Sequence, residues 1–317
     1  MQNFASKTVK VSFVFSILIS FLFFSGCSNL SVEQEQPMEM TGFTPSKPVN
    51  IALVLGGGGS KGIAHLGAIQ ELEKEGIRPD LIVGCSAGAI AGALYADQPD
   101  LESSIRTLLP LKKADILDYS YLNPTFGFVN GDLLHGLMRR LLQSTHFHEL
   151  SIPLIVVATD LITGEPLELC SGEISHAVRA SCAVPGVFKP VSLHGRYCID
   201  GGASCPVPVS IARKYGAKIV IAIDLSTKLP EDTPKHLFGV TKRSLEIAYR
   251  NFVKHSLTQA DIPIRMNFDY LGTFSDDQNE WLYEQGREVI REKLPEIKQK
   301  LKLLKLNLPT KFLKESE

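Results

Sequence analysis

The sequence lacks an excess of charge of either sign. Its 33 Lys and Arg residues nearly balance 34 Asp and Glu residues, so the net charge is −1. Proteins that bind nucleic acid usually present a basic face or stripe, and the composition gives no reason to expect such a partner. Tryptophan is nearly absent, with a single residue. In total, 44% of the residues are hydrophobic and 21% are charged. These values are typical of a globular chain and exclude a disordered or fibrous one.

Cysteine is scarce, and its spacing gives no sign of a metal. None of the six cysteines forms a C-x-x-C pair or a zinc-finger spacing. We therefore expect no metal and no other cofactor. Five of the cysteines follow Cys27, and an odd number cannot all pair in disulfides. The sequence does not decide whether a disulfide such as Cys198–Cys205 forms. The five are Cys85, Cys170, Cys182, Cys198 and Cys205.

No hydrophobic run in the sequence is long enough to span a bilayer comfortably. The longest near the start, residues 11–24, has fourteen residues, whereas a permanent transmembrane helix needs about 20. Two lysines precede this run, no acidic residue occurs in residues 1–26, and Ser25-Gly26 follows. This pattern is typical of a secretory signal peptide, which we assign to residues 1–26.

The residue after this segment is Cys27. Phe24-Ser-Gly-Cys27 resembles a bacterial lipobox, although Phe24 stands where leucine is usual. The resemblance implies that Cys27 carries lipid and anchors the chain to a membrane. It also implies a lipoprotein facing the periplasm of a Gram-negative envelope, with Ser28 favouring the outer membrane. The alternative is an ordinary secretory or transmembrane start with a chance cysteine.

The rest of the chain divides into three predicted parts. Residues 27–47 are polar, acidic and contain prolines, which predicts a flexible tether with a reach of about 25 Å. A folded domain follows over residues 48–275. Residues 276–317 form a C-terminal helical segment, with a break expected at Pro295. Its lysines and leucines fit either a terminal helix packed on the domain, which we favour, or a basic amphipathic helix on anionic lipid.

Short apolar runs alternate with helical patterns through the domain. Runs at 51–55, 81–84, 154–159 and 219–224 predict buried parallel strands. Residues 63–75 carry apolar side chains on one helical face and stop at Gly76, and residues 87–96 form a second helical pattern. This alternation predicts an α/β fold with a mainly parallel central sheet.

One short motif lies between a predicted strand and a predicted helix. Gly84-Cys85-Ser86-Ala87-Gly88 is a G-x-S-x-G sequence. A sharp strand-to-helix turn exposes the serine Oγ, and flanking glycines avoid collisions there. The start of the next helix also favours negative charge beside Ser86. This context predicts that Ser86 is a nucleophile.

A glycine-rich loop links the first predicted strand to the first helix. It fails as a phosphate-binding P-loop, because Lys61 is followed by glycine instead of Ser or Thr. The dinucleotide fingerprint also fails, since the second strand ends at a nucleophile and not at an acidic residue. Backbone N–H groups that stabilise an oxyanion remain as the favoured interpretation. The residues of this loop are Gly57, Gly58, Gly59, Ser60, Lys61 and Gly62.

A nucleophilic serine requires a base, and the sequence leaves its identity open. None of the eight histidines stands in a setting that singles it out. Asp200-Gly201-Gly202 follows an apolar stretch, and the glycines would let Asp200 approach another part of the backbone. Taken alone, that motif is more typical of a turn.

Together these motifs resemble those of patatin-like phospholipases. The loop at 57–62, the Ser86 motif and Asp200-Gly201-Gly202 have the order and spacing of that family, and the likeness spans about residues 50–225. Lys61 stands where arginine is commoner, and residues 203–209 depart from the commoner form that contains asparagine. The resemblance implies a three-layer fold, with helices flanking the sheet, and a patatin-like hydrolase domain over 48–275.

The resemblance also implies chemistry. It implies a Ser86–Asp200 dyad that hydrolyses acyl esters of a phospholipid or lysophospholipid without a metal. Two alternatives stay open. One is a Ser-His-Asp α/β-hydrolase acting on small esters, with His236 or His255 completing the triad. The other is a non-catalytic lipid-binding lipoprotein.

Overall fold

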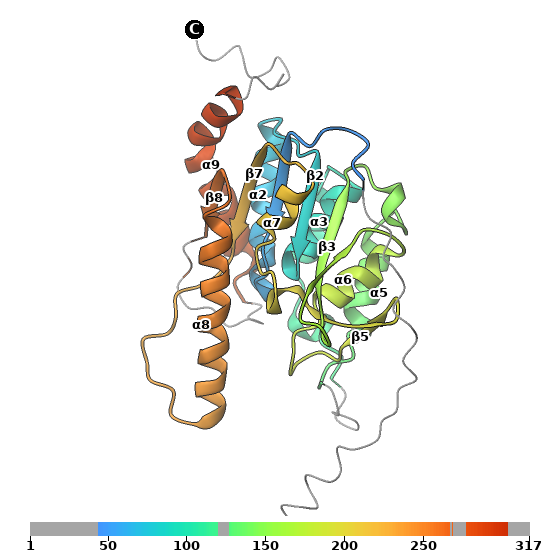
Figure 1. The fold of residues 1–317 in the computed structure, drawn as a ribbon, viewed down its shortest axis with the longest axis vertical. Coiled ribbons are helices and arrows are strands. Elements are labelled where there is room, and N and C mark those ends of the chain that lie inside the picture. The colour runs from blue at the N-terminus through green and yellow to red at the C-terminus, as the bar shows by residue number, and fades with distance from the viewer. Residues whose placement is uncertain (1–43, 120–126, 267, 269–276, 304–317) are drawn as a thin grey trace, which may run out of the picture. The chain divides into compact units, whose positions relative to one another are not determined.

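Within the described residues, five parallel strands run side by side from the middle of one eight-stranded sheet to one of its edges (Figure 1). The computed structural model describes residues 44–119, 127–266, 268 and 277–303, so the predicted signal peptide, Cys27 and nearly all of the predicted tether lie outside the described residues. The parallel strands are β1 Ile51–Leu55, β2 Leu81–Cys85, β3 Leu154–Asp160, β7 Ile219–Asp224 and β8 Ile262–Arg265. The first four match the predicted runs and are buried along their whole length.

Three antiparallel strands complete the sheet on the β3 side. They are β4 Pro166–Leu169, β5 Val191–Leu193 and β6 Arg196–Asp200. The strand order is β5-β6-β3-β2-β1-β7-β8, and β4 also pairs with β3. β6 comes late in the sequence, but its end therefore lies beside β3 and close to the end of β2.

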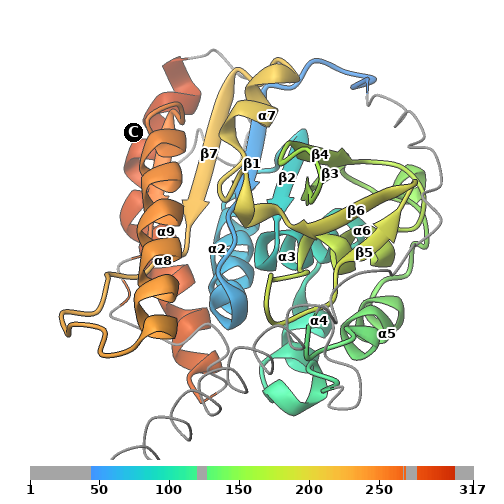
Figure 2. The ribbon, with the colours of Figure 1, turned by 60° about the horizontal axis from the view of Figure 1, so that its bottom comes forward.

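Helices cover both faces of the sheet, which confirms the expected three-layer α/β architecture (Figures 1 and 2). Alternate strand residues point to opposite faces. Leu53 and Leu55 of β1 belong to one hydrophobic cluster, whereas Ala52 and Val54 belong to the other. The first cluster packs against α2 Ile63–Lys74, α3 Ala87–Asp97, α4 Glu102–Leu108, α5 Asp132–Leu141, α6 Ile174–Ser181 and α9 Asn279–Leu303. The second packs against α7 Val209–Lys214 and α8 Leu237–Leu257. Short 3₁₀ turns lie at Gly59–Gly62, Lys113–Asp115, Phe147–Glu149 and Gly201–Ala203.

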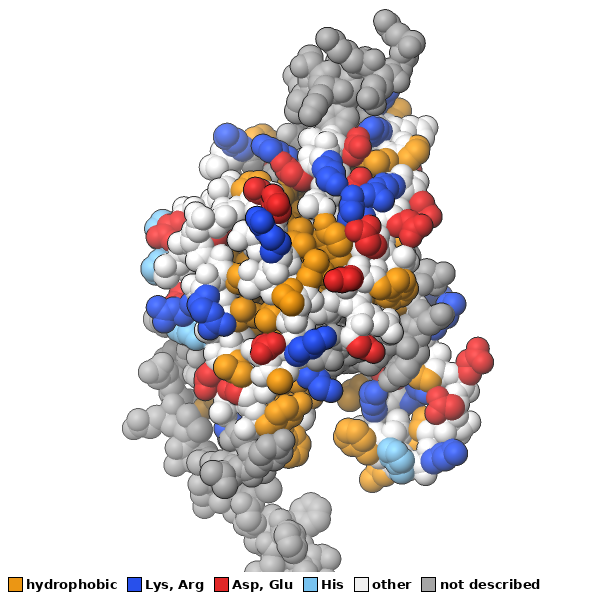
Figure 3. All heavy atoms as spheres, turned by 180° about the vertical axis from the view of Figure 1, so that it is seen from behind, with side chains coloured by type: hydrophobic (Ala, Val, Ile, Leu, Met, Phe, Trp, Pro, Cys, Tyr) orange, Lys and Arg blue, Asp and Glu red, His pale blue; other side chains and the backbone are white. Residues whose placement is uncertain are grey.

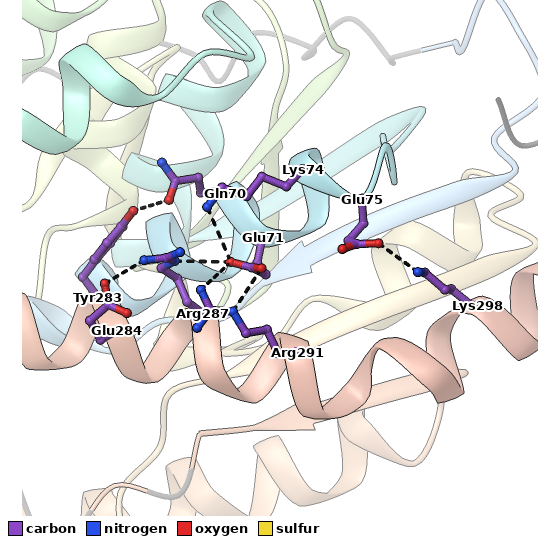
Figure 4. A network of polar contacts seen from close by, with 9 residues as sticks. All are labelled: Gln70, Glu71, Lys74, Glu75, Tyr283, Glu284, Arg287, Arg291 and Lys298. Carbon is purple, nitrogen blue, oxygen red and sulfur yellow. Dashed lines mark hydrogen bonds and ion pairs between the residues drawn. The ribbon is translucent and has the colours of Figure 1, made fainter. Parts of the chain in front are cut away.

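The predicted break at Pro295 is wrong, because α9 continues through it. Proline removes one helical hydrogen bond, but contacts with the rest of the domain hold the helix on both sides of Pro295. Before it, Arg287 and Arg291 bind Glu71 of α2, and after it Lys298 pairs with Glu75 (Figure 4). Ile297 and Leu301 are fully buried. This end of α9 is therefore packed on the domain, as the favoured interpretation expected.

Glu71 is the centre of the α2–α9 contact, so its removal is expected to destabilise the fold. Burial alone raises the pKa of Glu71, but hydrogen bonds from Arg291 and Arg287 outweigh burial and leave the pKa below its usual value. A lowered carboxyl pKa gives stability that is present at neutral pH and lost as the pH falls through the acid range. Glu71→Ala should lower the free energy of unfolding by about 2 kcal/mol at pH 7, measured in urea.

The matched control for this prediction is Glu75→Ala. Glu75 pairs with Lys298 at 2.8 Å, but both side chains are about one-third exposed. Solvent screening should limit its effect to less than about 1 kcal/mol. Equal losses for the two variants, or a Glu71→Ala loss that does not shrink toward pH 3, would contradict the prediction.

Candidate active site

Ser86 lies at a sharp turn between β2 and α3. Its φ of 53° is positive, a conformation that non-glycine residues adopt rarely and that is often found at functional sites. The two flanking glycines make this turn possible. A Cβ on Gly84 would lie 2.6 Å from the Gly88 oxygen, and a Cβ on Gly88 would lie 2.1 Å from the Leu55 oxygen. The sequence motif therefore forms the expected strand-to-helix turn.

The structure brings Ser86 and Asp200 into direct contact. Ser86 Oγ donates a hydrogen bond of 2.6 Å to Asp200 Oδ2, and both side chains are buried. The register explains this meeting of residues far apart in the chain. Cys85 is aligned with Val157 on one side of β3, and Asp200 is aligned with Ala158 on the other. β3 thus holds the ends of β2 and β6 at nearly the same height.

The environment of Asp200 suits a base that works near neutral pH. Burial raises the pKa of Asp200 to about 6, against the opposing effect of hydrogen bonds from Ser86 and from the Gly202 N–H. The Gly202 N–H donates to Oδ1 at 2.7 Å, so the carboxylate is held by one oxygen and leaves the other for Ser86. A Cβ on Gly201 would lie 2.2 Å from the Val157 oxygen. Gly201 thus lets the backbone pass close to β3, and Gly202 lets its own N–H reach the Asp200 carboxylate.

The glycine-rich loop presents free N–H groups beside Ser86, although fewer than the sequence suggested. The N–H of Gly57 donates to the Pro206 oxygen at 3.0 Å, which removes Gly57 from the expected oxyanion set. Within the described residues, the N–H groups of Gly58, Gly59 and Ala87 have no protein acceptor. A helix start or tight turn with unpaired N–H groups is suited to bind negative charge.

Two cavities of different character meet at Ser86. The first, about 140 Å³, is lined mainly by apolar side chains such as Leu66, Ile90 and Leu134. The second, about 430 Å³, contains Asp200 and the glycine-rich loop together with charged groups, among them Lys61 and Arg250. Burial lowers the pKa of Lys61 to about 8, and the nearby Asp224 and Glu246 act in the opposite direction. Ser86 therefore has an apolar pocket on one side and a partly cationic one on the other.

Three residues that the sequence did not predict as part of the site hold its backbone in place. Ser181 of α6 accepts the Ser86 N–H at 2.8 Å and donates to the Val157 oxygen at 2.6 Å. His65 of α2 contacts the Gly56 oxygen at 2.8 Å, and burial lowers the pKa of His65 to about 4, so the ring stays neutral. Tyr249 of α8 donates to the Gly57 oxygen at 3.0 Å. No local motif marks these residues, because each acts across at least nine positions of the chain.

Other candidates fall outside the site. His236 caps α8 and accepts the Gly239 N–H, and His255 lies near Gln259. In the part of the chain that the structure describes, neither histidine contacts Ser86 or Asp200, so the alternative Ser-His-Asp triad is not formed. Asp160 binds its own turn and Arg196, as expected of a structural acid.

No disulfide joins the five cysteines of the described region, and Cys85 is fully buried beside Ser86. One group of possible metal ligands lies elsewhere, on α5 and at the start of α6. His135 Nε2 and His176 Nδ1 each lie 3.7 Å from a Glu173 oxygen. The residues come from two helices, so sequence spacing could not reveal the group. Arg139 already places a cation 3.6 Å from the same carboxylate.

No described helix is both long and apolar enough to cross a bilayer.

The motifs at this site agree with a comparison against protein families. The family described as patatin-like phospholipase matches residues 53–213, about half of the chain. The chain belongs to the patatin-like phospholipase family. The matched region contains β1, the glycine-rich loop, Ser86 and Asp200.

Several curated relatives of this patatin-like chain are known. Patatin-like phospholipase domain-containing protein 6 of Mus musculus is 33% identical over 197 residues, which cover 60% of this chain and 14% of that protein. An uncharacterized NTE family protein of Mycobacterium tuberculosis is 33% identical over 57% of this chain and 50% of its own length. Lysophospholipase NTE1 of Cryptococcus neoformans is 31% identical over 69% of this chain and 14% of its own length. The chain thus spans half or less of these relatives.

A solved structure shares the patatin-like fold. VipD from Legionella pneumophila superimposes with a TM-score of 0.54 at 15% sequence identity, over 86% of this chain and 73% of that chain. This likeness bears on the fold alone and agrees with the three-layer arrangement.

Proposed function

We propose that this chain hydrolyses acyl esters of phospholipids or lysophospholipids, with Ser86 as nucleophile and Asp200 as base. The observation that carries the proposal is the 2.6 Å hydrogen bond from Ser86 Oγ to Asp200 Oδ2 at the junction of two cavities. Family membership supports the reaction class.

The proposed reaction has two halves. Asp200 takes the proton from Ser86 Oγ as this oxygen attacks the ester carbonyl carbon. The N–H groups of Gly58, Gly59 and Ala87 stabilise the oxyanion of the tetrahedral intermediate. The intermediate collapses, and the alcohol leaves with the proton from Asp200. Water then attacks the acyl-enzyme, Asp200 takes its proton, and the fatty acid is released as Ser86 regains a proton.

The two cavities support a lipid over a small polar ester. An acyl chain fits the apolar cavity beside Ser86, because burial of its methylene groups stabilises the complex by about 0.8 kcal/mol each. The wider cavity would hold the remainder of the lipid, with Lys61 near a phosphate. An anion there would also raise the lowered pKa of Lys61.

Fatty-acid release combined with active-site labelling tests the proposal. The full chain is incubated with phosphatidylglycerol, lysophosphatidylcholine and a p-nitrophenyl ester, and a fluorophosphonate probe is used to label the nucleophile. We expect release from the lipids and an adduct on Ser86, located by mass spectrometry, that blocks release. Hydrolysis of the p-nitrophenyl ester alone would support a general esterase. A folded chain that neither reacts nor releases acid would support the non-catalytic, lipid-binding alternative.

The raised pKa of Asp200 predicts a pH dependence. The base must be ionised to accept the proton from Ser86, and its pKa is raised to about 6, chiefly by burial. kcat/KM should therefore be constant above about pH 7 and fall about tenfold per pH unit below pH 6. The measurement uses an uncharged ester so that substrate ionisation does not contribute. A profile that stays flat down to pH 4 would contradict the assignment of Asp200 as base.

We propose further that Cys27 is lipidated and that the domain faces the periplasm, with the outer membrane favoured. The support is the sequence pattern of residues 1–28 alone, because these residues lie outside the described part of the chain. Radioactive palmitate should label the wild-type chain but not Cys27→Ala. Wild-type chain that stays unlabelled would contradict the proposal.

A further inference from the structure

α8 exposes an unusual number of large apolar side chains. Leu237 is 85% exposed, Phe238 75% and Leu245 68%. Val253 and Leu257, the buried residues of this helix, both lie near its end. We call the exposed set the α8 apolar face. Its members are Leu237, Phe238, Val240, Leu245, Ile247 and Phe252.

The amphipathic arrangement of α8 is reversed relative to that of a helix packed on a core. At 100° per residue, the six members of the α8 apolar face occupy roughly one half of the circumference. Lys242, Glu246 and Arg250 lie on the other half, on the same side as Val253. The apolar half thus faces outward, whereas a surface helix normally turns its apolar stripe to the core. Exposed apolar side chains gathered on one half of a helix indicate an interaction surface.

The α8 apolar face is continuous with the mouth of the candidate active site. Leu245 and Phe252 line the wider cavity together with Ser86 and Asp200. The start of α8 projects beyond the carboxyl ends of the parallel strands, at the edge of the sheet that carries Ser86 (Figures 1 and 2). In Figure 3 it forms part of the lobe at the lower right, which stands apart from the body of the domain and carries hydrophobic side chains beside basic, acidic and His side chains.

The segment around α8 carries positive charge, although the chain as a whole does not. Residues 226–258 contain six Lys or Arg and three Asp or Glu, whereas the net charge of the whole chain is −1. Among the basic residues are Lys235, Lys242 and Lys254. An apolar helical face flanked by basic residues is typical of helices that lie in the interface of an anionic bilayer.

We propose that the α8 apolar face inserts into the surface of an anionic lipid bilayer and brings the mouth of the wider cavity to that surface. The inference rests on the proposed function for its meaning, because a lipid that leaves the bilayer beside α8 would enter the cavity that contains Ser86. Insertion itself requires no catalysis. It is also distinct from anchoring through Cys27.

Tryptophan fluorescence tests insertion at α8 independently of other membrane contacts. The chain has one tryptophan, Trp281, which is replaced by the substitution Trp281→Phe. Phe238→Trp then places a single probe on the α8 apolar face of the full chain. Leu303→Trp in the same background is the matched control, since Leu303 is equally exposed, at 75%, but ends α9. Both are mixed with vesicles of phosphatidylcholine with or without phosphatidylglycerol, containing brominated lipid as quencher.

With phosphatidylglycerol vesicles, the probe at position 238 should shift its emission to the blue and lose at least half of its intensity to the brominated lipid. The control probe should change little. Equal quenching of both probes, or none at position 238, would overturn the proposal. Equal quenching with and without phosphatidylglycerol would overturn the choice of an anionic surface. A blue shift that depends on protein concentration, without vesicles, would indicate a second copy of the chain as the occupant instead.

The same measurement is repeated with Ser86→Ala added. Unchanged quenching by a chain that releases no fatty acid separates docking from chemistry. If the chain with intact Ser86 inserts at α8 but hydrolyses no ester, the proposed function fails and the docking surface stands. If the chain hydrolyses lipid without insertion at position 238, the docking proposal fails and the proposed function stands.

Discussion

Asp200→Asn should lower kcat by about 10³- to 10⁴-fold while leaving the fold intact, by comparison with the loss of the acid in other serine hydrolases. An amide cannot accept the proton from Ser86 Oγ, but its oxygen can still accept the Gly202 N–H that now binds Oδ1. Ser86→Ala should lower kcat at least as much. The double variant should lower kcat no further than the worse single variant does, because the two residues act as one unit.

Stability provides a second readout for Asp200→Asn. The pKa of Asp200 is raised to about 6 by burial, so the folded state disfavours the charged carboxylate. A raised carboxyl pKa means that the wild type loses stability as the pH rises from about 4 to above 6. The asparagine variant lacks this loss and should therefore be more stable than the wild type at pH 8, although it is inactive. Urea unfolding at pH 4 and pH 8 measures the difference.

Asp160→Asn is the matched control for this variant. Asp160 is also a buried carboxylate beside the same strands, but it binds Arg196 and the N–H groups of its own turn. This variant should lose stability and keep most of its kcat. Wild-type turnover by Asp200→Asn, or equal losses of kcat in the two variants, would rule out the dyad.

Gly88→Ala should destabilise the fold by about 3 kcal/mol, the upper part of the range for overpacked sites. The new Cβ would lie 2.1 Å from the Leu55 oxygen, 2.5 Å from the Leu55 carbonyl carbon and 2.8 Å from the Gly56 oxygen. All three atoms are backbone atoms, so no side chain can move aside. β1 and the glycine-rich loop must shift away from α3, which should also lower kcat. Urea unfolding gives the stability and ester hydrolysis gives kcat.

Gly136→Ala is the control for this substitution. Gly136 also lies within a helix, α5, but the nearest atom to its added Cβ is Arg140 Nη1 at 3.6 Å. Alanine is a better helix former than glycine, so this variant should gain about 0.5–1 kcal/mol. If both glycine variants behave alike, the close approach of α3 to β1 is not what requires Gly88.

Much of the fold and the nucleophile of the site could be predicted from local patterns. The four buried parallel runs, the helices at 63–75 and 87–96, and the turn at Ser86 follow from hydrophobic period and glycine placement, which act over a few residues. The residues alone left the base open, and Asp200 was assigned by the resemblance of the motifs to those of patatin-like phospholipases. The structure then brought Asp200 within 2.6 Å of Ser86.

Only the tertiary structure decided which neighbours support this pair. The bonds of Ser181 and Tyr249 to the site backbone, and the engagement of the Gly57 N–H by Pro206, arise where strands and helices far apart in sequence meet. Contacts to α2 on both sides of Pro295 likewise keep α9 continuous against the local tendency of proline. The tertiary structure also decided that the α8 apolar face points outward. A helical period marks which residues share a face, but the packing of the whole domain decides which face meets the core.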